Sequence, residues 1–189
     1  MTEVSGGPEF PRTIRTPRLT LRPFKPSDVN AVLGYESDAA YGEFLGVPHP
    51  YRRSDAERGV ASRMLCDWTR AAMWAVDLEG DAIGNVGMTL YAGHGRIDLY
   101  YGLARAHWGM GYMTEAVRAA IDAAFTTFPN VNRVQADANP ENPASLRVMA
   151  KAGMTPEGVL RQYVVMHGAA TDQVMCSILR REWETVSKE

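Results

Sequence analysis

The sequence predicts a single α/β (α+β) domain whose elements follow the order β-α-α-β-β-β-α-β-α-β-β. The length of 189 residues suits one domain. Three strand-like segments joined by short polar turns follow one another between residues 73 and 103, as in an antiparallel meander. A glycine-containing turn then leads into the clearest helix of the chain, at residues 112–128.

Composition excludes several classes of protein. The net charge of −2 provides no basic field for a nucleic-acid partner. No run of about 18 apolar residues is long enough to span a membrane, and the first residues lack the basic and apolar regions of a signal peptide. Cys66 and Cys176 match no metal-ligand spacing, so no metal site is predicted. We therefore expect a protein of the reducing cytoplasm with no nucleic-acid or membrane partner.

The first third of the chain contains one strand and two helices. Residues 1–17 carry three prolines and are expected to form a flexible lead-in. Apolar and polar residues alternate over residues 18–24, which predicts a strand. Ser27 is the expected N-cap of the first helix, and a capping box begins the second helix at residues 54–68. The irregular stretch at residues 36–53 is long enough to be a functional loop.

Helical and alternating patterns of apolar residues predict the elements of the remaining chain. Apolar residues recur every three or four positions in the long helix and form one stripe, as in a helix packed on one side. The expected elements are strands at residues 73–77, 83–90, 97–103, 133–138, 159–166 and 173–179, and helices at residues 112–128 and 142–153. Residues 18–184 then make one domain, followed by a tail at residues 185–189.

The turn before the long helix is the most informative segment. Gly109 and Gly111 allow the backbone to approach a bulky ligand, because no Cβ intrudes. The first N–H groups of a helix have no internal partner, and the helix dipole favours negative charge there. These features predict an anion site, most often one for phosphate. Tyr112 and Thr114 stand where a Walker loop and a dinucleotide fingerprint need other residues. A tight connection without a ligand is the alternative.

Residues 103–116 resemble the acetyl-CoA loop of the GCN5-related N-acetyltransferase (GNAT) superfamily. Its pattern, Gln/Arg-x-x-Gly-x-Gly/Ala, falls on residues 106–111, with Ala106 in place of the usual Gln or Arg. The RimJ/RimL-type branch of ribosomal-protein acetyltransferases has Trp-Gly-x-Gly-Tyr-x-Thr-Glu-Ala, which residues 108–116 match. Further motifs of that branch follow in the right order, at residues 16–22, 142–145, 151–154, 157–158 and 181–183, with Met154 in place of the usual Phe.

The resemblance implies a mixed, mostly antiparallel sheet of about seven strands with helices on both faces. It also implies direct transfer of an acyl group from acetyl-CoA, or from a larger acyl-CoA such as succinyl-CoA, without a metal. The strand ending at Leu103-Ala104 is expected to splay from the next strand and to bind the pantetheine arm, while amides of the glycine loop face the pyrophosphate. The expected CoA-binding residues are Leu103, Ala104, Trp108, Gly109, Met110, Gly111, Tyr112, Met113, Thr114, Asn139, Asn142 and Ser145.

Three residues are candidates for the chemistry that the resemblance implies. The N–H of Leu103 is the candidate donor to the oxyanion of the reacting thioester. Ser145 is the candidate acid for the leaving thiolate, because Met149 stands where many superfamily members have a tyrosine; a local role in the first helical turn is the alternative. Asp98 is the candidate base, in the strand where histone acetyltransferases have a glutamate, and a solvent-facing strand residue is its alternative.

The identity of the acceptor stays open at this point. The resemblance implies a primary amine, either a protein N-terminus or a small molecule, and residues 36–68 and 159–175 are expected to build its site. An antibiotic-modifying acetyltransferase would use the same chemistry, and an acceptor cleft rich in Asp and Glu would favour such cationic drugs. A non-catalytic acyl-CoA-binding or sensing domain is the alternative from another class. The sequence is compatible with a homodimer.

Overall fold

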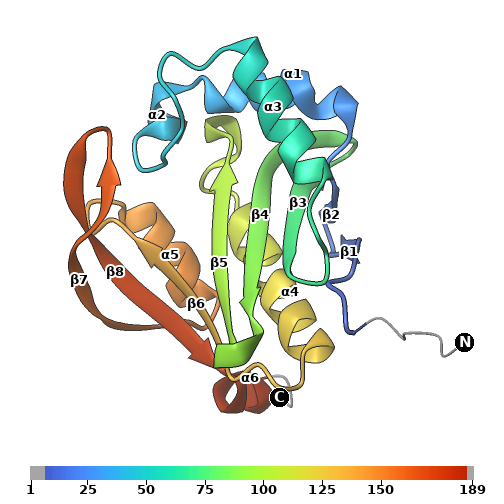
Figure 1. Ribbon diagram of the computed structural model, residues 1–189, viewed down its shortest axis with the longest axis vertical. Helices are drawn as coiled ribbons and strands as arrows, with labels where there is room; N and C mark the ends of the chain where they lie inside the picture. The colour runs from blue at the N-terminus through green and yellow to red at the C-terminus, as the bar shows by residue number, and fades with distance from the viewer. Residues whose placement is uncertain (1–6, 187–189) are drawn as a thin grey trace, which may run out of the picture.

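The computed structural model describes residues 7–186, so residues 1–6 of the expected lead-in and residues 187–189 of the expected tail lie outside it. One sheet of eight strands has the order β1-β2-β3-β4-β5-β6-β8-β7 (Figure 1). The strands are β1 (Ile14–Arg15), β2 (Thr20–Pro23), β3 (Ala71–Leu78), β4 (Asp81–Tyr91), β5 (Arg96–Leu103), β6 (Arg133–Ala138), β7 (Thr155–Met166) and β8 (Ala169–Leu179). The helices are α1 (Val29–Glu36), α2 (Ala39–Gly42), α3 (Arg53–Met64), α4 (Tyr112–Thr127), α5 (Pro143–Lys151) and α6 (Arg180–Val186).

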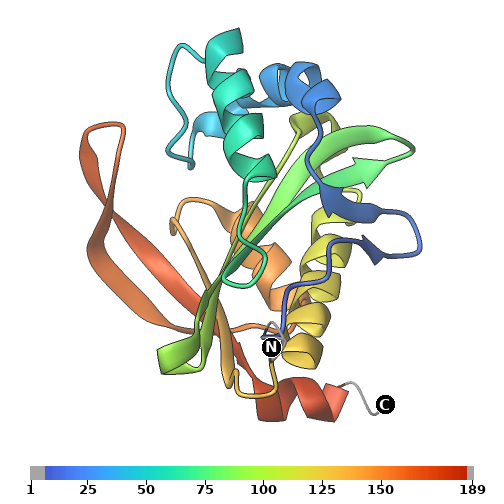
Figure 2. The same ribbon diagram turned by 45° about the vertical axis from the view of Figure 1, so that its right-hand side comes forward.

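Helices cover both faces of the sheet, as the sequence predicts. Alternation along β3 shows this directly, because Trp74 and Val76 pack in the cluster that contains α4, whereas Ala75 packs in the cluster that contains α1 and α3. The apolar stripe predicted for the long helix is buried along α4. Figure 2 shows α4 on one side of the sheet and α1 and α3 on the other. Within residues 7–186 we find no helix with the length and apolar content to cross a membrane.

The sheet splits between β5 and β6. This pair is the parallel one among antiparallel neighbours, and it is short: Arg96–Asp98 pair with Arg133–Gln135. Since β5 continues to Leu103 and β6 to Ala138, the two strands separate beyond this point. Figure 1 shows the two halves of the sheet diverging from the lower end of β5, with α5 behind the opening.

Packing begins earlier in the chain than the sequence predicts. Phe10 lies in the expected lead-in, yet it is 1% exposed and its ring packs against Trp74 and Phe128. The two residues of β1 pair with β2 and bring the number of strands to eight. A single phenylalanine among glycines and prolines has no periodic pattern, so its burial depends on distant partners that the local sequence does not reveal.

The helix starts also differ in detail from the prediction. Asp55 accepts a hydrogen bond from the N–H of Arg52 at 2.8 Å, so α3 begins at Arg53, and it ends at Met64. Short helix α2 forms within the stretch expected to be irregular, where the carboxylate of Asp38 accepts from the N–H of Ala40. Helix α6 after β8 is an element that the sequence did not indicate.

Candidate active site

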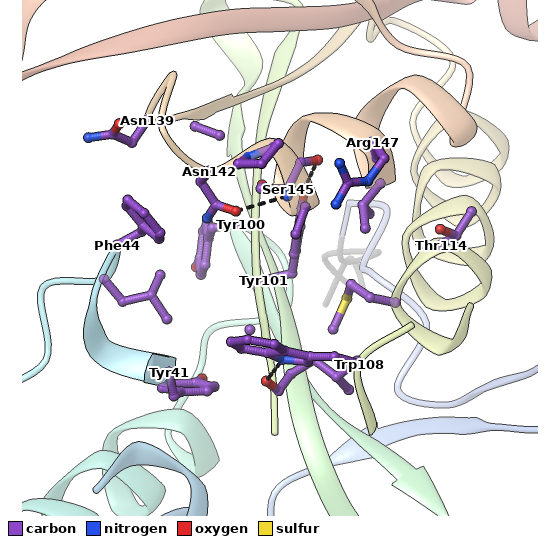
Figure 3. A pocket seen from close by; sticks show the side chains of 18 of the residues that line it. Tyr41, Phe44, Tyr100, Tyr101, Trp108, Thr114, Asn139, Asn142, Ser145 and Arg147 are labelled. Atoms are coloured by element: carbon purple, nitrogen blue, oxygen red, sulfur yellow. Dashed lines mark hydrogen bonds between the residues drawn. The ribbon is translucent and has the colours of Figure 1, made fainter. Parts of the chain in front are cut away.

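A cavity of about 570 Å³ opens where β5 and β6 diverge (Figure 3). Its walls come from the ends of these strands, the glycine loop, the first turns of α4 and α5, the α2 segment and the β7–β8 hairpin. Ten of the twelve expected CoA-binding residues line it, and these are Leu103, Trp108, Gly109, Gly111, Tyr112, Met113, Thr114, Asn139, Asn142 and Ser145.

The backbone of Leu103 faces the opening. Leu103 stands opposite Gly84 of β4, and the next residue donates its N–H to Ile83 O at 2.8 Å. Because bonded and non-bonded positions alternate along an antiparallel pair, the N–H and C=O of Leu103 point away from β4 and into the gap. The indole Nε1–H of Trp108 donates to the Leu103 carbonyl at 2.7 Å. The N–H of Leu103 is therefore the group that faces the cavity.

Ala104, one of the expected CoA-binding residues, has both of its backbone groups bonded within the fold. Its N–H donates to Ile83 O, and its carbonyl accepts from the N–H of His107 at 2.9 Å. Both backbone groups are thus used within the fold, and Ala104 does not line the cavity. By the alternation along β5, Tyr101 and Leu103 are the cavity-lining residues whose backbone groups face the gap beyond the part of β5 that pairs with β6.

The glycine loop has the geometry expected of an anion site. After a 3₁₀ turn at Arg105–His107, Gly109 and Gly111 have φ values of +77° and +80°, which glycine adopts without strain. The first bond of α4 runs from Glu115 N–H to Gly111 O at 3.1 Å. The N–H groups of the first three residues of α4, Tyr112 to Thr114, therefore have no helical acceptor and line the cavity.

Hydrogen bonds of Arg18 and Glu115 stabilise the glycine loop. The Nε–H of Arg18 donates to Glu115 Oε2 at 2.7 Å, and the hydroxyl of Thr16 donates to Oε1 at 2.6 Å. Burial alone would raise the pKa of Glu115, but these hydrogen bonds outweigh it and lower that pKa. Arg18 also donates to Met110 O at 3.0 Å and stacks over Tyr112. The side chain of Met110 is exposed and lies outside the cavity lining, so the expected CoA contact of Met110 stays a prediction.

Ser145 faces a tyrosine that the sequence analysis did not single out. Asn142 caps α5 by accepting from Ser145 N–H at 3.0 Å. The Ser145 hydroxyl lies 2.8 Å from the Tyr101 hydroxyl, which also donates to Ser145 O at 3.1 Å (Figure 3). Burial raises the pKa of Tyr101 to about 12, so the phenol stays protonated at neutral pH. Side chains alternate along β5, so Tyr101 lies on the same face as Leu103. This alternation is the sequence signal that could have identified Tyr101 as a site residue.

The opposite end of the cavity is built by the segments expected to hold the acceptor. Tyr41 and Phe44 come from the α2 segment, and Met166 from the hairpin. The Tyr41 hydroxyl accepts from Asn85 Nδ2 at 3.0 Å. A Cβ at position Gly102 would lie 2.3 Å from that hydroxyl, so only glycine allows the tyrosine to pack against β5 here.

Residues 18–155 match the family described as acetyltransferase (GNAT) domain. The chain belongs to the GNAT family. A curated relative, the uncharacterized N-acetyltransferase p20 of Bacillus licheniformis, is 31% identical over 177 residues, which cover 90% of this chain and 98% of p20. A GNAT-family acetyltransferase of Bacillus anthracis superposes with a TM-score of 0.80 at 25% identity, covering 89% and 99% of the two chains. RimJ of Mycobacterium smegmatis, solved in complex with CoA-disulfide, has a TM-score of 0.82 at 22% identity over 94% and 91%.

Membership of the GNAT family confirms the predicted fold and the predicted class of enzyme, an N-acetyltransferase. The likeness to RimJ at 22% identity is a likeness of fold. It agrees with the branch that the loop motif resembles.

Asp98 is not brought to the cavity of this GNAT domain. It stands at the last paired position of β5, and its carboxylate forms an ion pair with Arg96, with Oδ1 and Nε 2.9 Å apart. Asp137 of β6 lines the cavity instead, two residues beyond Gln135, the strand partner of Asp98. Partial burial, and secondly the charge of Asp98, raise the pKa of Asp137. Because Asp137 lies in a strand of alternating polar and apolar residues, its sequence context is that of an ordinary polar strand residue.

Proposed function

We propose that this GNAT protein transfers the acetyl group of acetyl-CoA directly to a primary amine held between α2 and the β7–β8 hairpin. The observation that carries the proposal is the split sheet, where the inward-facing N–H of Leu103 and the free amides of the α4 start share one cavity. RimJ of similar fold was solved with a CoA disulfide, which supports a CoA ligand here.

The CoA-binding half of the cavity suits phosphates. The free N–H groups at the start of α4 would bind the pyrophosphate, since they lie at the positive end of the helix dipole. Arg147 and Lys151 of α5 line the facing wall and add two positive charges. Polar residues at the mouth of the gap, Asn139 and Asn142, would flank the pantetheine arm.

The opposite half, which we call the acceptor half, favours acetyl over succinyl transfer. Its lining residues are Ala40, Tyr41, Glu43, Phe44, Leu45, Tyr100, Gly102, Asp137, Met166 and Gln173. Two of these are carboxylates, and the lining that the structure describes in this half contains no lysine or arginine to pair with a succinyl carboxylate. The same carboxylates repel the single free carboxylate of a succinyl group, so the neutral acetyl group fits better.

Residues around the gap can provide a base for the amine, a donor to the oxyanion and a proton for the leaving sulfur. Asp137 accepts a proton from the ammonium form of the acceptor, because a carboxylate with a raised pKa is a better base than an ordinary one. As the N–C bond forms and the C–S bond breaks, Leu103 N–H donates to the developing oxyanion. For this step the Tyr101 phenol turns its single proton to Ser145 Oγ, so that the Ser145 hydroxyl is free to donate to the leaving sulfur. Ser145 passes its proton to the sulfur and takes up the second proton of the amine nitrogen, so CoA leaves as the thiol.

A CoA-release assay tests the proposal. Acetyl-CoA and succinyl-CoA are each incubated with a panel of primary amines, while calorimetry measures CoA binding. We expect release from acetyl-CoA with at least one amine, and a large loss of turnover for Asp137→Asn. Asp81→Asn is the matched control, because Asp81 is exposed at the start of β4 and outside the cavity. Tight CoA binding without release for any acceptor would replace the proposal by a non-catalytic acyl-CoA-binding domain.

A further inference from the structure

Charge is distributed unevenly along the walls of the cavity. Arg147, Lys151 and the positive end of α4 lie in the CoA-binding half. Glu43 of the α2 segment and Asp137 of β6 lie in the acceptor half. The cavity thus pairs a positive end, which suits a polyanion, with a negative end, which suits a cation.

The two carboxylates of the acceptor half are free to bind a ligand. Among the residues that the structure describes, no ion pair or side-chain hydrogen bond joins Glu43 or Asp137 to another group. Other carboxylates of the fold are paired, as Glu36 is with Arg63 and Asp98 with Arg96. Two ammonium groups, one at Glu43 and one at Asp137, would therefore each gain a partner without breaking an existing pair.

Aromatic and apolar side chains line the walls between these carboxylates. Tyr41, Phe44 and Tyr100 come from two different elements and lie on the same side of the cavity (Figure 3), and Leu45 also lines it. The faces of tyrosine and phenylalanine rings attract ammonium groups and also pack against methylene chains. This lining suits a flexible or compact amine with an apolar body between its charges.

The two segments that line the acceptor half are in contact with each other. His167, in the turn between β7 and β8, has its Nε2 3.1 Å from Gly42 O at the end of α2. The α2 segment and the hairpin are therefore in contact, and the cavity of 570 Å³ must hold both the thioester end of CoA and the acceptor. This confinement favours a small molecule over the N-terminus of a folded protein.

We propose that the acceptor is a small amine with at least two positive charges, whose reacting amino group lies at Asp137 and whose second ammonium group binds Glu43. The inference rests on the proposed acetyl transfer and specifies its substrate. Amines that carry a carboxylate, and N-termini of acidic peptides, are poor acceptors because the same two carboxylates repel them.

Matched pairs of amines test the inference. We expect 1,5-diaminopentane and spermidine to have kcat/KM values about tenfold or more above that of pentylamine. An acidic peptide with a free N-terminus should be poorer still. High salt should reduce the advantage of the dications, since it screens the charges that attract them to the cavity.

Glu43→Gln gives the decisive variant, because it removes a charge while keeping the shape. We expect it to raise KM for the diamine about tenfold with little change in kcat, and to change KM for pentylamine much less. Asp81→Asn again serves as the control. Equal use of pentylamine and diaminopentane by the wild type, or an unchanged ratio in Glu43→Gln, would overturn the inference while acetyl transfer stands. Failure of every amine would instead overturn the proposed function.

Discussion

Replacing Gly111 with aspartate tests the anion site at the start of α4. Gly111 has φ +80° and precedes the free N–H groups of the helix. A Cβ here would have its nearest neighbour, Arg18 Nη2, at 3.4 Å, so there is room for a side chain. Aspartate and asparagine are among the L-residues that tolerate a left-handed conformation best, and they have almost the same size. Comparing Gly111→Asp with Gly111→Asn therefore isolates one negative charge.

The size of the effect follows from Coulomb's law. A carboxylate about 5 Å from one phosphate charge is repelled by about 0.8 kcal/mol in bulk water and by about 3 kcal/mol at an effective dielectric constant of about 20. These limits correspond to a loss of affinity between about fourfold and a few hundredfold. The new carboxylate would also accept from the N–H groups that the phosphates need, as an N-cap does. Arg18 offsets little of this, because Glu115 already occupies it.

Calorimetric titration of both variants with CoA measures the difference. We expect the aspartate variant to bind more weakly than the asparagine variant. The gap should shrink between about 0.1 M and about 1 M salt, as the Debye length falls from about 10 Å to about 3 Å. Thermal unfolding without ligand controls for folding, and we expect the two variants to be similar. Equal CoA affinity of two folded variants would refute the placement of the phosphates at this helix end.

Three further predictions concern the groups that support the site. Tyr101→Phe leaves the Ser145 hydroxyl without its partner, so we expect kcat to fall about tenfold while KM for acetyl-CoA stays nearly constant in steady-state assays. Trp108→Phe removes the donor to the Leu103 carbonyl, which should raise KM for acetyl-CoA and lower the free energy of unfolding by about 1 kcal/mol in denaturant titrations. In the folded state the pKa of Glu115 is lowered, so Glu115 stabilises the fold fully above its unfolded pKa of about 4.3, and this contribution is lost as the pH falls through the folded pKa. The destabilisation caused by Glu115→Gln should therefore be largest at neutral pH and disappear in acid; a constant difference at all pH values would contradict the ion pair.

The parts of the site that depend on local sequence were predictable. The apolar stripe of the long helix places it at residues 112–128, and α4 spans Tyr112–Thr127. The strand predicted at residues 133–138 has the same bounds in β6. Gly109 and Gly111 adopt the positive φ values that a close approach to a ligand requires. Each of these features follows from the period or the backbone freedom of neighbouring residues.

The residues that lie beside the proposed catalytic groups were not predictable in the same way. Tyr101 and Ser145 are 44 positions apart, and they meet because the sheet splits just before Tyr101. The position of the split depends on how far the parallel register of β5 and β6 extends, which no local pattern specifies. The same register leaves Asp98 within the paired part of the sheet and Asp137 at the edge of the gap.

Net charge conceals the feature on which substrate choice depends in this proposal. Arg147 and Lys151 at one end of the cavity and Glu43 and Asp137 at the other sum to zero, so they add nothing to the total of −2. The field between them is nevertheless directed along the path from cofactor to acceptor, where low-dielectric walls strengthen it. A near-neutral composition is therefore fully compatible with a cavity that attracts a polyanion from one side and a polycation from the other.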